Sequence, residues 1–310
     1  MRAIVQYGYG GPEVLTLARR PVPEPGPHEV LVRVHAAGLN PVDWQTRSGR
    51  GVARSMGAFP FTVGWDVSGE VVRTGPDVTE FRAGDEVFGM PRFPGQAAAY
   101  AEYVVAPARD LAPKPAGLDH TRAASLPLAG LTAWTALTAK ARVRAGDRVL
   151  VHAAAGGVGH LAVQLAKALG AHVIGTASAG KHDFVTALGA DEVVDYRTVR
   201  FEKAVSTVDA VLELGGGDNA ARSLSVLRPG GTLVDIAHHG GRGLGAGTGI
   251  RVVGMLVKPD GRALRELARL TDQGRLKPFV ERVHPLDEAA AAHAYGETRT
   301  GTGKLVLATI

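Results

Sequence analysis

The sequence of 310 residues contains no cysteine. This absence excludes disulfides, zinc–thiolate sites, iron–sulfur clusters and cysteine nucleophiles. A chain without cysteine suits a reducing compartment, and residues 1–15 lack the long apolar core of a signal peptide. We therefore expect a cytoplasmic protein.

A dense run of positive charge is also missing. Lys and Arg outnumber Asp and Glu by 35 to 30, but the basic residues are scattered and no row of aromatic residues accompanies them. This pattern favours a solvated surface of mixed charge over a nucleic-acid-binding face. No run suits a membrane span either, because the two long uncharged stretches, residues 123–139 and 149–166, contain proline, glycine or histidine.

The chain is long enough for two domains, and its pattern changes near residue 118. Before that point, short valine-rich segments bounded by glycine and proline predict β-strands at residues 2–7, 29–37, 66–75 and 101–108. After it, predicted strands alternate with predicted helices, which implies right-handed crossovers and a parallel sheet. The last segment, residues 303–310, is a predicted strand that returns to the first domain.

A turn of small residues is the most informative local motif. The predicted strand RVLVHA leads into Ala153-x-x-Gly156-x-x-Gly159 and directly into a predicted helix. This is a variant of the dinucleotide fingerprint in which small residues let the backbone approach a pyrophosphate at a helix N-terminus. Since the turn lies inside a repeated strand–helix pattern, we predict a dinucleotide site made by Ala153, Gly156, Gly157, Val158 and Gly159.

The identity of the dinucleotide is predicted from the end of the second strand of this pattern. An acid placed there would hold the ribose 2′-hydroxyl of NAD, but residues 176–182 contain no Asp or Glu. Ser178 and Lys181 are available instead, and Tyr196 follows the third strand. These side chains suit a 2′-phosphate, so we predict NADPH.

Several segments spread over the whole chain share one family pattern: PGPHEVLVRVHAAGLNPVDWQTRSG, VGWDVSGEVVRTGPDVTEFRAGDEVFG, LPLAGLTAWTAL, VHAAAGGVGHLAVQLAKALGA and GTGKLVLATI. Through these segments the chain resembles, from end to end, the zinc-independent quinone oxidoreductase branch of the medium-chain dehydrogenase/reductase superfamily. The resemblance implies an α/β protein with a GroES-like β-barrel catalytic domain, residues 1–120 and 259–310. It also implies a doubly wound Rossmann-type domain, residues 121–258, with the active site in the cleft.

The resemblance also indicates where zinc-dependent members hold their metal. The corresponding places here are Asn40, Trp65 and residues 128–129, which offer no Cys/His set. Asp66 stands where the family has an acid that orients a metal ligand, but this chain has no metal ligand there. His238 and His239 are adjacent, and on a strand their side chains would point to opposite faces, so a structural role is favoured. We therefore expect no metal.

In this branch the segment after an early glycine lines the substrate pocket. The resemblance makes Asn40 and Gln45 hydrogen-bond donors to the substrate, with Trp44, Arg47 and Trp65 in the pocket. Gln45 can donate a hydrogen bond but cannot act as a general acid. Two alternatives stay open: Asp43 is a helix cap or a buried ion-pair partner, and Trp44 is a pocket wall or a core residue.

Thr132 matches a family threonine near the nicotinamide, although a helix-interior hydroxyl bonded to a backbone carbonyl is the other interpretation. The function implied is NADPH-dependent hydride transfer to a quinone or α,β-unsaturated carbonyl. An enoyl reductase acting on thioester or polyketide-type intermediates is one alternative, and an RNA-binding or structural crystallin-like protein is another. Residues 250–257 predict an apolar edge strand, so we expect a homodimer.

Overall fold

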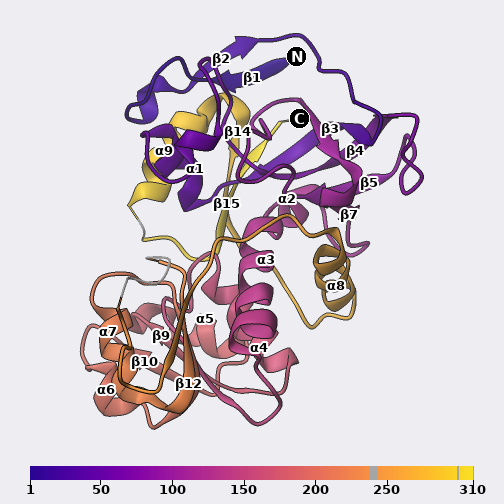
Figure 1. Cartoon of the computed structure of the whole chain (residues 1–310). Helices are drawn as coiled ribbons and strands as arrows, with labels where there is room; N and C mark the ends of the chain where they lie inside the picture. The colour runs from indigo at the N-terminus through magenta and orange to yellow at the C-terminus, as the bar shows by residue number, and fades with distance from the viewer. Residues whose placement is uncertain (238–242, 299, 310) are drawn as a thin grey trace. The chain divides into compact units, whose positions relative to one another are not determined.

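The computed structural model describes residues 1–237, 243–298 and 300–309 (Figure 1). It divides into two compact units. The first unit comprises residues 1–131, 258–274 and 278–310, and the second comprises residues 132–257 and 275–277. The first unit extends beyond residue 120 because α2 (His120–Ala124) packs on strands β3 and β4 of that unit.

The first unit is built mainly from antiparallel strands. Its strands are β1 (Arg2–Val5), β2 (Thr16–Arg19), β3 (Glu29–Gly38), β4 (Asp66–Thr74), β5 (Glu86–Gly89), β6 (Tyr103–Pro107), β7 (Leu111–Pro113), β14 (Val280–Pro285) and β15 (Lys304–Ala308). The main sheet has the order β14-β15-β3-β4-β5-β7, with β6 also paired to β3. Strand β15, yellow in Figure 1, pairs antiparallel with β3, so the predicted return of the C-terminal strand is confirmed.

Besides α2, the described α-helices that complete or adjoin this unit are α1 (Pro41–Arg47), α3 (Pro127–Thr135), α8 (Gly261–Asp272) and α9 (Ala289–Glu297). Helix α1 has Pro41 at its first position, and the Asp43 carboxylate accepts a hydrogen bond from the Asn40 N–H at 2.6 Å. In helix α8 the Asp260 side chain accepts from two backbone N–H groups, and Leu264 and Leu267 are buried on one face.

The second unit is a parallel sheet with helices between its strands. In chain order its elements are η4 (Ala136–Ala141), β8 (Arg148–Val151), α4 (Gly159–Ala168), β9 (His172–Ala177), η5 (Ala179–Lys181), α5 (His182–Ala187), β10 (Glu192–Asp195), α6 (Phe201–Ala204), β11 (Val208–Glu213), α7 (Asn219–Ser223), β12 (Leu227–Asp235) and β13 (Arg251–Gly254). The strand order is β10-β9-β8-β11-β12-β13. This is the doubly wound order of a Rossmann-type domain, so the predicted fold class is confirmed.

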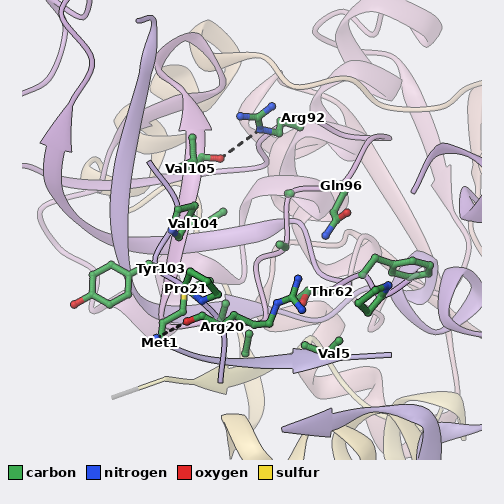
Figure 2. A pocket seen from close by; sticks show the side chains of 17 residues that line it. Met1, Val5, Arg20, Pro21, Thr62, Arg92, Gln96, Tyr103, Val104 and Val105 are labelled. Atoms are coloured by element: carbon green, nitrogen blue, oxygen red, sulfur yellow. Dashed lines mark hydrogen bonds between the residues drawn. The ribbon is translucent and has the colours of Figure 1, made fainter. Parts of the chain in front are cut away.

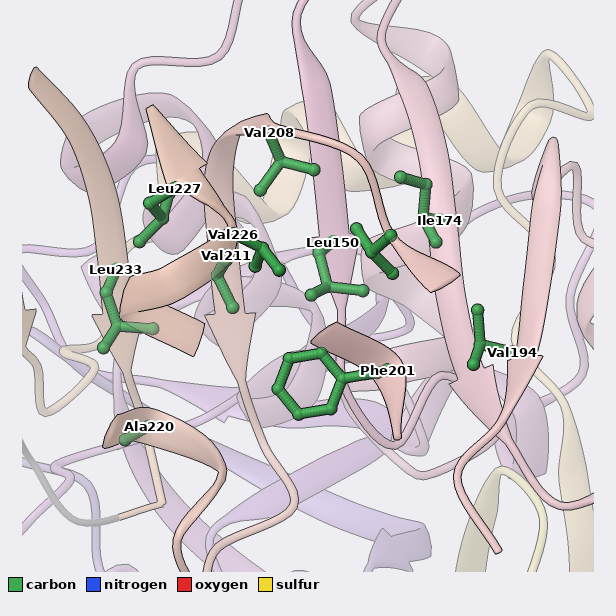
Figure 3. Close-up of a cluster of buried hydrophobic side chains, with 11 residues drawn as sticks. Leu150, Ile174, Val194, Phe201, Val208, Val211, Ala220, Val226, Leu227 and Leu233 are labelled. Atoms are coloured by element: carbon green, nitrogen blue, oxygen red, sulfur yellow. The ribbon is translucent and has the colours of Figure 1, made fainter. Parts of the chain in front are cut away.

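Apolar side chains from neighbouring strands and helices form a core of the second unit (Figure 3). Leu150, Ile174, Val194, Val211 and Leu233 come from five successive strands of the sheet, and Phe201 packs among them from α6. Strands buried on both faces read as continuous apolar runs, which explains why these segments were predicted readily. This packing fixes the carboxyl ends of the strands, where the predicted nucleotide-binding residues lie.

Candidate functional site

The small-residue turn lies at the point where the strand order of the second sheet reverses. Strand β8 ends at Val151, and β9 and β11 lie on its two sides. In open α/β sheets this switch point is where a ligand binds outside the carboxyl ends of the strands. Helix α4 begins at Gly159, so the turn connects the central strand to a helix N-terminus as predicted.

Backbone atoms at the start and the end of this turn lie close together. A Cβ on Gly159 would come within 2.2 Å of the Ala153 carbonyl oxygen, and one on Gly156 within 3.2 Å of the same atom. Ala153 itself has φ +48, a left-handed conformation that side chains other than glycine rarely adopt. The turn therefore tolerates only small residues at these positions.

The same geometry leaves backbone donors available. The N–H groups of Gly157 and Val158 have no hydrogen-bond partner among the residues that the structure describes, and no side chain caps α4. Gly156, Gly157 and Val158 are partly exposed. Free N–H groups at a helix N-terminus bind phosphate groups. The residues present thus fit a dinucleotide pyrophosphate, as the sequence predicts.

Two polar side chains that sequence reasoning missed support the turn. The Ala153 N–H donates to Thr176 Oγ1 at 3.3 Å, and His152 Nδ1 lies 3.2 Å from the same oxygen. His152 Nε2 lies 3.0 Å from Ser223 Oγ, so this buried ring joins β8, β9 and α7. Burial lowers the pKa of His152 to about 4, which keeps the ring neutral near pH 7. The signal was present in the sequence, because His152 and Thr176 end or follow predicted strands.

Glu213 is a buried carboxyl group at the end of β11. It accepts a hydrogen bond from the Gly216 N–H through Oε1, while its Oε2 has no partner among the described residues. Oε2 lies 3.8 Å from His152 Nε2. Burial raises the pKa of Glu213 to about 7, so the carboxyl group titrates near neutral pH.

The predicted 2′-phosphate residues lie at neighbouring strand ends. Ala177 of β9 pairs with Asp195 of β10, and Ser178 and Tyr196 are the residues that directly follow them. Tyr196 is 55% exposed. Lys181 ends η5 at the start of α5. These three residues therefore follow the carboxyl ends of two neighbouring strands.

Arg197 adds a cation that sequence reasoning missed. Its guanidinium carbon lies 5.9 Å from the centre of the Tyr196 ring. The signal was its position directly after Tyr196 at a strand end. Thr132, also predicted for the cofactor, lies on α3 and is almost fully buried.

The predicted substrate segment on α1 belongs to a buried network in the first unit. Asn40 Nδ2 donates to Asp66 Oδ2 at 2.8 Å, and Asn40 Oδ1 accepts from the Lys304 ammonium group. Lys304 Nζ also lies 3.6 Å from Asp66 Oδ2. Burial raises the pKa of Asp66 and lowers that of Lys304, and the attraction between the two charges opposes both shifts.

The network continues through an aromatic hydroxyl. Tyr100 OH donates to Asp43 Oδ2 at 2.9 Å and lies 3.1 Å from His293 Nε2. Burial raises the pKa of Asp43 to about 7. Burial and the nearby Arg47 charge lower the pKa of His293 to about 3. Asp43 is thus a helix cap, one of the two roles that the sequence left open for it, and it also accepts a hydrogen bond from Tyr100.

The structure leaves one predicted substrate residue with an available side chain. Gln45 is partly exposed and its amide makes no hydrogen bond with the described residues. Arg47 is buried and binds Glu297 Oε1 at 2.7 Å. Asn40 is 1% exposed and is held by Asp66 and Lys304, so its geometry suits a positioning role.

The two tryptophans predicted for the substrate pocket, Trp44 and Trp65, are buried. Trp65 is fully buried, its indole N–H donates to the Gly95 carbonyl at 2.7 Å, and its ring packs edge-on against Phe93. The ring of Trp65 therefore fills the core, and its expected place in the substrate pocket stays a prediction. Trp44 is nearly buried and packs against Gly296 and His293 of α9.

Two further findings concern metals and membranes. Within residues 1–237, 243–298 and 300–309, no cluster of three or more His, Asp or Glu side chains has the arrangement of a metal site. His238 and His239 lie outside the described residues. None of the helices in the described part of the chain is both long and apolar enough to cross a membrane.

Comparison with protein families matches both parts of the chain. Residues 26–116 match the alcohol dehydrogenase GroES-like domain, and residues 188–307 match a family described as zinc-binding dehydrogenase. The first match confirms the GroES-like prediction. Among curated proteins, the mitochondrial NAD(P)H oxidoreductase RTN4IP1 of Danio rerio is 35% identical over 91% of this chain and 84% of its own length. The quinone oxidoreductase of Sus scrofa is 34% identical over 99% and 97%.

Solved structures agree with these relatives. The quinone oxidoreductase from Coxiella burnetii is 41% identical with a TM-score of 0.92, covering 100% of this chain and 99% of that one. Escherichia coli quinone oxidoreductase, solved as a complex with NADPH, is 30% identical with a TM-score of 0.89 and full coverage of both chains. Since relatives of this similarity align over nearly its whole length, the chain belongs to the quinone oxidoreductase branch of the medium-chain dehydrogenase/reductase superfamily.

Proposed function

We propose that the protein is an NADPH-dependent oxidoreductase that transfers hydride to a quinone or an α,β-unsaturated carbonyl compound without zinc. The observation that carries the proposal is the turn of residues 153–159, with its unpartnered N–H groups at the switch point of the sheet. The names of the relatives, and the NADPH complex of the Escherichia coli protein, point the same way.

In this proposal the second unit binds the cofactor through three groups of residues. The N–H groups of Gly157 and Val158 bind the pyrophosphate, and Thr132 lies near the nicotinamide. Ser178, Lys181 and Tyr196 surround the 2′-phosphate, and Arg197 adds a second positive charge there. The bound NADPH supplies the hydride.

The substrate is held by α1 in the first unit. Gln45 has the only free side-chain donor among the predicted substrate residues that the structure describes, so we assign it to the substrate oxygen. A conjugated acceptor spreads the negative charge that develops there, and a neutral amide donor is sufficient to stabilise it. Gln45 cannot supply a proton, which must come from water or the cofactor ribose. Asn40 acts indirectly, by fixing the first turn of α1 between Asp66 and Lys304.

The sharpest test of the cofactor assignment compares two dinucleotides. Lys181→Ala and Arg197→Ala should each weaken NADPH binding about tenfold, because each removes a charge-assisted contact of roughly 1.5 kcal/mol. NADH binding should stay unchanged, since NADH lacks the 2′-phosphate. Fluorescence titration measures both dissociation constants, with Lys203→Ala, an exposed lysine of the same unit, as the matched control. Equal wild-type affinity for the two dinucleotides would rule out the assignment.

A panel of NADPH-oxidation assays tests the acceptor. Steady turnover of simple quinones and enones supports the proposal, whereas turnover confined to enoyl thioesters would replace it with an enoyl reductase. Salt-sensitive RNA binding without turnover would support the non-enzymatic alternative. Efficient oxidation of a simple alcohol with NADP⁺ would contradict the proposal, because such a reaction needs a group that stabilises an alkoxide.

We also propose a homodimer formed through the edge strand β13. This strand ends the six-stranded order, and Leu256 just beyond it is 49% exposed. An edge strand with apolar side chains pairs readily with the same strand of a second copy around a two-fold axis. Light scattering should give the mass of a dimer, and Leu256→Glu should shift it toward the monomer. A monomeric wild-type protein at micromolar concentration would contradict this proposal.

A further inference from the structure

A pocket in the first unit is not used by the proposed reaction (Figure 2). Its volume is about 430 Å³, which lies in the range of small-molecule sites. Residues of β1 and β6 line it together with three connecting segments near residues 20–23, 60–62 and 92–98. All of these residues belong to the first unit.

The wall of this pocket is apolar with a few polar groups. Val5, Pro21, Phe61 and Val104 are among its apolar lining residues. Its neutral polar side chains are Thr62, Gln96 and Tyr103, and its charged side chains are Arg20 and Arg92. No aspartate or glutamate lines the pocket. The lining thus combines apolar surface with positive charge alone.

The two arginines differ in what they bind. The guanidinium of Arg92 forms an ion pair with Glu29, so its charge is already balanced. The guanidinium of Arg20 makes no ion pair or hydrogen bond with any residue that the structure describes. Figure 2 shows the Arg20 side chain extending along the pocket toward Thr62. Arg20 therefore offers one uncompensated positive charge next to apolar surface.

The backbone around the pocket is held in an unusual conformation. Arg92 has φ +61 and Ala98 has φ +62, both in the left-handed region that side chains other than glycine rarely adopt. Such residues occur preferentially at ligand-binding positions, where the surrounding structure fixes them. The Arg92 N–H is fixed by Asp110 Oδ2 at 2.9 Å. The loop of residues 92–98 thus forms one wall of the pocket in a fixed backbone conformation.

From these features we infer that the pocket is a second ligand site, which takes a monoanion with an apolar body, such as a medium-chain or aromatic carboxylate. Arg20 binds the carboxylate through its planar guanidinium, and the apolar wall covers the body of the ligand. Met1 also lines the pocket, but its terminal ammonium group donates to the Arg20 carbonyl oxygen at 2.8 Å. The Arg20 guanidinium is planar and matches the two oxygens of a carboxylate. The site shares no residue with the dinucleotide turn or with the predicted substrate segment on α1.

The experiment uses octanoate as the probe and isothermal titration calorimetry as the readout. Octanoate should bind the wild-type protein at a single site. Arg20→Gln should weaken this binding at least fivefold, while Arg19→Gln, an equally exposed arginine outside the pocket lining, should leave it unchanged. 1-Octanol and octylammonium should bind more weakly than octanoate, because neither carries the negative charge.

Two further measurements keep the outcome unambiguous. Val105→Phe adds volume to the partly exposed wall and should also weaken octanoate binding. NADPH affinity, measured in the same samples, should not change in Arg20→Gln, so a failure of the cofactor proposal would be seen separately. The inference is overturned if octanoate does not bind at millimolar concentration, if both arginine variants behave alike, or if octylammonium or octyl phosphate binds more tightly than octanoate.

Discussion

Each unit buries a small group of titratable side chains, and the two groups are built differently. Both contain a histidine of lowered pKa, His293 at about 3 and His152 at about 4, and a carboxyl group of raised pKa, Asp43 and Glu213 at about 7. In the first unit a Lys304 ammonium group balances the buried carboxylates. In the second unit Glu213 has no such partner, and its Oε2 is unpaired among the described residues.

This difference follows from what each group supports. The network of the first unit fixes one short helix, α1, through side chains that come from four separate parts of the chain. The polar residues of the second unit support a turn whose binding groups are backbone N–H groups. Side chains thus build one site, and the backbone builds the other. Substitutions should therefore damage the first site by removing charge and the second by adding volume.

The largest expected effect comes from removing the ammonium group of the first unit. Lys304→Met leaves Asp66 buried without its counter-charge, and breaking a buried pair in this way costs about 3–5 kcal/mol of folding free energy. Urea unfolding measures the loss. Lys258→Met, at an exposed lysine of the same unit, should change the unfolding free energy by less than about 0.5 kcal/mol.

A double variant tests whether the cost arises from the pair. Lys304→Met combined with Asp66→Asn removes both charges, so it should be less destabilised than the sum of the two single variants by at least about 1 kcal/mol. Strict additivity would show that Asp66 and Lys304 do not interact. The stability of the first unit would then not depend on the pairing of these two buried charges.

The two sites were predictable from the sequence to very different degrees. The dinucleotide turn is local: residues 153–159 carry the pattern, and the flanking strand and helix are strongly apolar. The network around Asn40 is not local, because residues 40, 66, 100, 293 and 304 meet only in the folded chain. The sequence therefore predicted that the segment of α1 matters, but not the hydrogen bonds that hold Asn40 between Asp66 and Lys304.

The helices and strands also differ in how readily the sequence predicts them. The strands of the second unit were predicted because they are buried on both faces. No element was predicted over residues 280–297, where β14 has the adjacent charged residues Glu281 and Arg282 and α9 is rich in alanine without an amphipathic pattern.

A smaller but still large effect should come from adding one methyl group to the turn of the second unit. Gly159→Ala places a Cβ 2.2 Å from the Ala153 carbonyl oxygen, a backbone atom that cannot move aside without shifting the turn. We expect a loss of about 3 kcal/mol in folding free energy, at the upper end for overpacking. NADPH affinity should fall at least tenfold, measured by fluorescence titration. Gly117→Ala, where a Cβ meets open space, is the control; equal behaviour of the two variants would contradict the prediction.

The smallest effect is a change in how stability depends on pH. A histidine whose pKa is lowered from 6.5 on folding stabilises the protein fully above pH 6.5, and this contribution falls as the pH decreases toward the folded-state value. A carboxyl group whose pKa is raised to about 7 acts in the opposite sense, because the unfolded chain ionises first as the pH rises from about 4. Between about pH 4.5 and 6.5 the two contributions oppose each other within each unit.

Replacing one member of each histidine–carboxyl pair should therefore reveal how the other member makes the unfolding free energy depend on pH. His293→Gln should make the slope of unfolding free energy against pH more negative by about 1.4 kcal/mol per pH unit, and Asp43→Asn should make it more positive by the same amount. His152→Gln and Glu213→Gln should give the corresponding changes in the second unit.

The units should differ at pH 8, where Glu213→Gln removes an ionised carboxylate that lacks a counter-charge and should raise stability. Asp43→Asn also disturbs the hydrogen bonds to Tyr100 and Asn40 and should not raise it. Urea unfolding at four pH values measures all four slopes, and unchanged slopes in the variants would show that these groups titrate alike in the folded and unfolded chain.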